Sequence, residues 1–94
     1  MIHTLEAHSL APGGASLRFT WNEATGEVTG PDAAAVVAAA GAAQAARMVE
    51  VQGRGYTISN PLRCRDEMAL LMVSMGYNPP DFLRGALPLR VVRL

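Results

Sequence analysis

Lysine is absent from this 94-residue chain, and all eight of its basic residues are arginine. Eight acidic residues balance them, so the formal net charge at pH 7 is zero. A chain without net charge has no overall field to attract nucleic acid or an anionic membrane. The codons of a GC-rich genome explain the arginine bias and the abundance of alanine. The alternative is a need for the bidentate contacts that guanidinium makes with carboxylates and phosphates. We prefer the codon explanation.

Cysteine, aromatic residues and long apolar runs are also scarce or absent. Cys64 is the single cysteine, which excludes an intrachain disulfide and a cysteine zinc site and is typical of a reducing compartment. The few aromatic residues offer little for stacking on nucleic acid bases. No stretch of about 18 apolar residues occurs, and the N-terminus lacks a basic region followed by an apolar segment. We therefore expect a cytoplasmic, soluble protein of a bacterium or phage with no membrane partner.

Groups for acid–base catalysis are few. His3 and His8 are the only imidazoles, and both lie in the lead segment 1–14, where rigid positioning is least expected. The adjacent Asp66 and Glu67 would diverge by about 100° on a helix, so they cannot share a substrate as a catalytic pair. No constellation for catalysis, cofactor binding or metal binding is evident, and we expect a protein that is not an enzyme.

Two local features have specific chemistry of their own. Cys64 lies between Arg63 and Arg65 near a predicted helix start, where the helix dipole and the arginines would lower the thiol pKa and favour a nucleophile. The alternative, which we favour, is a small core or boundary residue. The N-terminal Met1-Ile2-His3 can bind Cu(II) or Ni(II), as in any chain with histidine third, and we treat this as incidental.

Strand and turn patterns occupy the first thirty residues. The segment 1–14 ends in the turn sequence Leu-Ala-Pro-Gly-Gly, and we expect it to be a flexible lead or an edge strand. Leu17, Phe19 and Trp21 then alternate with polar residues, which indicates a half-buried strand. The turn that closes at Gly26 returns the chain through 27–29, so a hairpin is predicted here.

An alanine-rich helix is predicted to follow, from about Pro31 to Met48. Proline suits a first helical position. The doubled Thr-Gly before it resembles a phosphate loop only superficially, because Pro31 has no amide hydrogen to donate and Asp32 would repel an anion. The alternating runs 49–52 and 56–59, joined by Gly53-Arg54-Gly55, predict a second hairpin.

The last third of the chain predicts a second helix and an extended arm. Ser59 or Asn60 is expected to cap this helix, with Pro61 in its first turn. Its apolar stripe is Met68, Leu71, Met72 and Met75. Gly76 is placed to end the helix in the left-handed conformation, and residues 81–83 are expected to form a helical turn. The segment 86–94 is predicted to be extended, and Pro88 restricts it to an edge strand or a partner-bound arm.

These elements predict one α+β domain over residues 1–94. Its order is ββαββα followed by the extended C-terminal arm 86–94. Antiparallel hairpins would pack on two helices in two layers. The core is expected to be small, because much of the apolar content is alanine.

The charges are distributed unevenly along the chain. Residues 1–46 hold one arginine and four acidic residues, whereas residues 47–94 hold seven arginines and four acidic residues. The basic half could therefore meet an acidic protein surface or a phosphate backbone. The residues expected to contact a partner are Arg54, Arg63, Arg65, Arg84, Arg90, Arg93, Val91 and Leu94.

We expect a non-enzymatic protein–protein interaction module, of phage or other mobile-element origin, that binds another protein or itself. Pairing of the arm Leu87–Leu94 with a neighbouring sheet edge would produce a homodimer. The alternative is a nucleic-acid-binding or regulatory protein that uses the arginine-rich C-terminal half. Zero net charge and the lack of lysine disfavour it. An enzyme or ligand carrier that uses Cys64 or the hairpin-to-helix turn ranks last.

Overall fold

The structure, a computed structural model, describes residues 2–84, and the predicted arm 86–94 lies outside these residues. Its elements in chain order are β1 (Ile2–Ser9), β2 (Leu17–Asn22), β3 (Glu27–Thr29), α1 (Ala33–Ala46), β4 (Met48–Val51), β5 (Arg54–Thr57), a 3-10 helix (Pro61–Arg63), α2 (Arg65–Ser74), β6 (Tyr77–Asn78) and α3 (Asp81–Arg84). The expected α+β fold of antiparallel hairpins packed on helices is confirmed.

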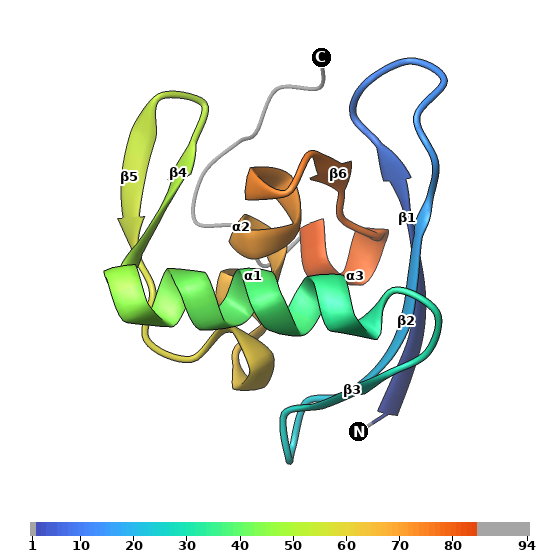
Figure 1. Ribbon diagram of the computed structural model, residues 1–94, viewed down its shortest axis with the longest axis horizontal. Helices are drawn as coiled ribbons and strands as arrows, with labels where there is room; N and C mark the ends of the chain where they lie inside the picture. Colours follow the sequence, from blue (N-terminus) through green and yellow to red (C-terminus); the bar gives the residue numbers. More distant parts are fainter. Residues whose placement is uncertain (1, 85–94) are drawn as a thin grey trace.

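Two separate β units flank the helices. One is a four-stranded sheet of order β3-β2-β1-β6, and the other is the hairpin β4-β5. In Figure 1 the sheet lies on the right and the hairpin on the left, and α1 runs across the front from one to the other. Helices α2 and α3 occupy the space between the two units.

The larger sheet turns one face to the core. Residues Leu5 and Phe19 pair across β1 and β2, as do Ala7 and Leu17, and all four are buried. Their neighbours along each strand are mostly exposed, which is the period-2 alternation expected of a strand with one solvated face. The predicted hairpin of Leu17, Phe19 and Trp21 with 27–29 is present as β2 and β3.

The lead segment takes a different place from the one expected. β1 pairs with β2 from Ile2 to Ala7 and with β6 at His8 and Ser9, so it is an inner strand and not a flexible lead or the sheet edge. Leu10 continues this connection by donating its amide hydrogen to the Gly76 carbonyl at 2.8 Å. Strand β6 was not predicted, because two residues are too short to show alternation.

Helix α1 is shorter than its prediction of 31–48. Asp32 precedes its first residue and binds β2 instead of capping the helix: its carboxylate accepts the Arg18 amide hydrogen at 2.7 Å. Arg47 ends the helix in the left-handed conformation, with φ of 60°. The helix buries Val36, Ala40 and Ala43, and the small side chains allow it to lie close to the core.

The second hairpin is present, but its turn begins one residue earlier and ends two residues earlier than predicted. The turn residues are Gln52 and Gly53, with φ of 52° and 80°. Positive φ at both residues is typical of the type I′ turn, which is common in two-residue hairpins. The expected turn Gly53-Arg54-Gly55 is therefore wrong, because Arg54 and Gly55 already belong to β5. Positive φ at Gln52 made the turn hard to place from sequence.

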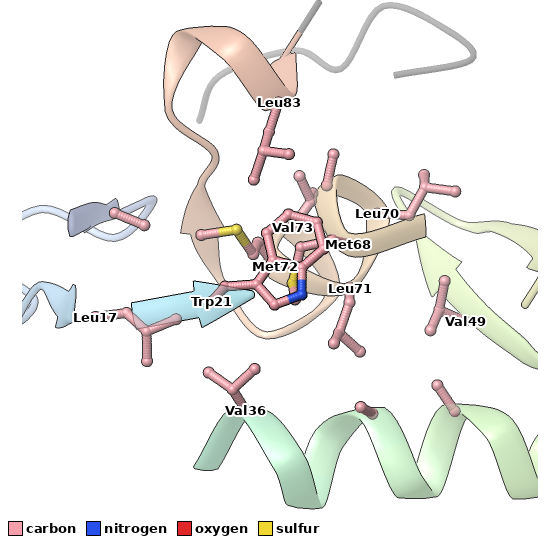
Figure 2. Packing of buried hydrophobic residues seen from close by; sticks show 14 of the residues in the cluster. Leu17, Trp21, Val36, Val49, Met68, Leu70, Leu71, Met72, Val73 and Leu83 are labelled. Atoms are coloured by element: carbon pink, nitrogen blue, oxygen red, sulfur yellow. The ribbon is translucent and has the colours of Figure 1, made fainter. Parts of the chain in front are cut away.

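Helix α2 is the centre of the core. It begins at Arg65, and Pro61 belongs to the preceding 3-10 helix, so the predicted start of the helix was too early. All six residues from Met68 to Val73 are buried, because the sheet, the hairpin, α1 and α3 surround this helix. Figure 2 shows Leu71 and Met72 between Trp21 of the sheet, Val36 of α1 and Leu83 of α3.

The end of α2 follows the prediction. Gly76 adopts φ of 96°, and its amide hydrogen bonds to the Val73 carbonyl at 3.0 Å. The helical turn expected at residues 81–83 is α3, which buries Leu83 against the core. Within residues 2–84, no helix combines the length and apolar character needed to cross a membrane.

Candidate functional site

The arginines that the sequence singled out do not form a basic face in the described part of the chain. Arg54 is exposed at the start of β5, and Arg63 is exposed in the 3-10 helix. The β4–β5 turn lies at the top left of Figure 1 and the segment 61–63 at the bottom. Arg84 is the last residue of α3. The remaining candidates, Arg90, Arg93, Val91 and Leu94, lie outside the described residues.

Arg65 is engaged within the chain itself. Its guanidinium makes two hydrogen bonds to the Glu23 carboxylate, at 2.9 Å and 2.8 Å. The Glu23 carboxylate also lies 3.0 Å from Nε2 of His3. The His3 ring stacks on Phe82 at 4.6 Å between centroids, and the Arg65 guanidinium lies 5.5 Å from the centre of that same ring. This charge cluster joins β1, the β2–β3 turn, α2 and α3.

The charge cluster changes the ionisation of its members. Hydrogen bonds from Arg65 and then from His3 lower the pKa of the Glu23 carboxyl from 4.5 to about 2. The Glu23 carboxylate in turn raises the pKa of Arg65 above its ordinary value. The His3 side chain is only 13% exposed and Glu23 only 21%, so neither projects into solvent. We interpret this cluster as a tertiary contact that connects these elements, in which the Arg65 guanidinium is already paired with Glu23.

Cys64 does not have the properties of an activated nucleophile. Burial raises the pKa of its thiol, and a hydrogen bond to the Asp66 carboxylate raises it further. The backbone hydrogen bond at Glu67 acts in the opposite direction but is weaker. The lowered pKa expected from Arg63 and Arg65 is therefore wrong, because burial and the neighbouring carboxylates outweigh them.

The described residues also offer no obvious place for a metal ion. Across residues 2–84, no three side chains of His, Cys, Asp or Glu gather closely enough to hold one. The incidental Met1-Ile2-His3 motif is only partly described, since Met1 lies outside these residues. The His3 imidazole is held between Glu23 and Phe82.

A more promising feature is an apolar groove between β4 and the C-terminal half of α2. It consists of two adjoining hollows of about 530 Å³ and about 380 Å³ that share Glu50 and Ser74. Val73 and the loop residues Leu10 and Pro12 line the larger hollow. The smaller hollow is lined by apolar residues of α1, β4 and α2, namely Ala39, Ala42, Ala43, Met48, Val49, Leu71 and Met75. Below, these two hollows together are called the groove.

Strand β4 borders the groove with an edge that no other strand of residues 2–84 covers. The two hollows are lined by β4 and not by β5, and β4 lies between β5 and α2 in Figure 1. At one end of the hairpin, the pair Val51–Arg54 flanks the two-residue turn. At the other end, the Ile58 amide hydrogen bonds to the Arg47 carbonyl at 3.1 Å.

The direction of the backbone groups on β4 follows from this pairing. Bonded pairs alternate along an antiparallel ladder, so Val49 and Val51 bond to β5. Met48 and Glu50 therefore direct their amide and carbonyl groups away from β5, toward the groove. Within residues 2–84, the hairpin has no third strand to accept them.

Glu50 is the single charged side chain among the described residues that line the groove. It is exposed, and it takes part in none of the ion pairs found within residues 2–84. An unpaired carboxylate beside apolar hollows favours a bound group that is apolar and carries a positive charge.

No protein-family model matches the chain, and no curated protein or solved structure is similar enough to count as a match. Sequence reasoning missed both the groove and the charge cluster. The alternation over 49–52 predicted β4, but it did not indicate which edge of the strand would lack a partner. Glu23 and Arg65 are 42 residues apart, so no local pattern connects them.

Proposed function

We propose that the protein is a non-enzymatic protein–protein interaction module that binds an extended segment of another polypeptide along β4. The observation that carries this proposal is the uncovered edge of β4 beside the apolar groove. Strand addition to an open sheet edge is a common mode of peptide recognition, in which main-chain hydrogen bonds supply affinity and pockets for alternate side chains supply specificity.

The side chains of β4 predict the chemistry of the bound segment. Val49 and Val51 are buried on one face of the strand, and Met48 and Glu50 are exposed on the other. An added strand would have its apolar residues on the same face as the two valines, above the groove. Its alternate residues would lie beside Glu50, where a lysine or arginine makes a favourable cross-strand pair.

Two proline variants distinguish a loss of binding at the β4 edge from damage to the hairpin. Glu50→Pro removes an amide hydrogen that points away from β5, so the β4–β5 ladder is kept while the outward donor is lost. Thr57→Pro is the matched control, since Thr57 pairs with Met48 and its amide points to the opposite, outer side of β5.

The test is selection of extended peptides from a displayed random library on the wild-type protein. We expect the selected peptides to alternate apolar residues with at least one basic residue. They should bind the Thr57→Pro variant as they bind the wild type, and the Glu50→Pro variant about tenfold more weakly, as expected for one or two lost hydrogen bonds. Equal binding to all three proteins, or no enrichment of such peptides, would refute the proposal.

A further inference from the structure

We infer that the segment which binds the groove is Leu87–Leu94 of a second copy of this chain. The inference rests on the proposed function and names its partner. The sequence Leu-Pro-Leu-Arg-Val-Val-Arg-Leu has the chemistry that the groove requires, because apolar residues flank a basic one. The described residues of β4 and the groove set this requirement.

The order of residues in this segment agrees with antiparallel addition to β4. Leu89 and Val91 alternate with Arg90, so a strand with the two apolar residues above the groove has Arg90 on the opposite face. That face is the one on which Glu50 is exposed. Arg90 placed opposite Glu50 forms a cross-strand ion pair beside the apolar contacts of Leu89 and Val91.

The position of Pro88 agrees with the same register. With Arg90 opposite Glu50 in an antiparallel pair, Pro88 falls opposite Gln52, and Gln52 belongs to the β4–β5 turn. Strand β4 ends at Val51, so Pro88 falls beyond the paired residues of β4, at a strand end where proline is tolerated. In this register Val92 lies opposite Met48, the other residue whose backbone groups face the groove.

A second copy is favoured over a single bound peptide by the surface area that a stable interface needs. A stable interface buries roughly 800 Å² on each partner, more than one short strand provides. In a two-fold symmetric dimer each copy both donates a segment and receives one, so every contact occurs twice. Helix α1 carries no charged residue, it lines the groove with Ala39, Ala42 and Ala43, and the groove residue Met48 is exposed, so an apolar surface is available for a wider contact.

The test is a charge-exchange cycle in the full-length protein, with the dimer dissociation constant measured by sedimentation equilibrium. Glu50→Arg and Arg90→Glu each place like charges opposite each other, twice in the dimer, and each should weaken association by about tenfold or more. The Glu50→Arg/Arg90→Glu double variant should recover most of the lost affinity. Glu27→Arg is the control: it makes the same charge change as Glu50→Arg on β3, which does not line the groove, and it should leave association unchanged.

A wild-type chain that stays monomeric at every concentration would overturn the inference. So would a double variant that associates no better than the two single variants. If the chain is monomeric and yet selected peptides bind in a manner that depends on Glu50→Pro, only the identity of the partner is wrong. If those peptides also fail to bind, the proposed function itself is wrong. A monomeric chain whose Glu50 amide is protected from hydrogen exchange in the wild type, but not in Arg90→Glu, would show that the groove binds the segment of the same copy. That result would also overturn the inference.

Discussion

At the scale of single residues, Glu23 has the largest effect on how distant parts of the chain are held together. Its carboxylate binds Arg65 at the start of α2 and His3 on β1, and the hydrogen bonds lower its pKa to about 2. The group is therefore ionised in the folded protein at any pH where an unfolded glutamate would begin to take up a proton. The folded state gains stability from this difference.

This pKa shift predicts a specific acid sensitivity. Because the folded pKa lies below the ordinary value of 4.5, the stabilisation is complete above pH 4.5 and is lost as the pH falls toward about 2. The Glu23→Gln variant should be less stable than the wild type at pH 7, and the two should converge over that window. Thermal unfolding followed by circular dichroism between pH 2 and pH 7 would measure it.

A matched variant distinguishes this effect from the loss of any carboxylate. Glu27 is exposed on β3 and belongs to none of the ion pairs within residues 2–84. Glu27→Gln should leave the pH dependence as it is in the wild type. A constant difference between Glu23→Gln and the wild type down to pH 2 would contradict the assignment of the lowered pKa to Glu23.

Cys64 provides a second prediction at this scale. Its thiol pKa is raised, so the thiolate is scarcer at pH 7 than for an ordinary cysteine, and alkylation by iodoacetamide should be slower than that of a free thiol. Asp66→Asn removes the neighbouring carboxylate, and the alkylation rate should increase. Alkylation quenched at a series of times and quantified by mass spectrometry measures both rates. A fast reaction of the wild type would restore the nucleophile hypothesis.

At the scale of elements, α1 and the β4–β5 turn each contain a glycine, and the two glycines differ in backbone conformation. Gly41 lies in the interior of α1, and a Cβ atom added there would meet nothing within 4 Å. Gly53 also has open space around it, but its φ is +80°. Alanine at Gly41 adopts the helical backbone without strain, whereas alanine at Gly53 must adopt a conformation that L-residues avoid.

The two substitutions should therefore change stability in opposite directions. We expect Gly41→Ala to raise the free energy of unfolding by about 0.5–1 kcal/mol through helix propensity. Gly53→Ala should lower it by about 1–2 kcal/mol through the left-handed backbone. Urea denaturation of both variants beside the wild type measures the difference. The same sign for both variants would contradict the assignment of their effects to backbone conformation.

At the scale of the whole molecule, the arrangement depends on one central helix. The buried residues Met68–Val73 lie in the middle of α2, which contacts both β units, whereas α1 and the larger sheet each have a face in solvent. The hairpin β4-β5 stays outside the four-stranded sheet, because α2 lies between them (Figure 1). Among residues 2–84, this separation leaves the edge of β4 without a neighbouring strand and produces the groove.

Several features of the fold followed from local patterns alone. Alternation at Leu17, Phe19 and Trp21 predicted β2, the alanine run predicted α1, and Gly76 marked the end of α2. Each of these signals depends on residues that are close in sequence, where periodicity and backbone preference act directly. The type I′ turn and the two-residue β6 were missed or misplaced, because positive φ at Gln52 and pairing over two residues leave little trace in sequence.

The sequence by itself determined the α+β class, the main helices and hairpins, and part of the core, namely Leu17, Phe19 and Trp21 of β2 and Met68, Leu71 and Met72 of α2. The tertiary structure alone decided that β1 is an inner strand, that Arg65 is paired with Glu23, and that the outer edge of β4 faces a groove with Glu50 beside it. The physical reason is distance along the chain. Hydrophobic periodicity repeats within a few residues, whereas strand neighbours and ion pairs between residues 40 or more positions apart depend on how the packed elements meet.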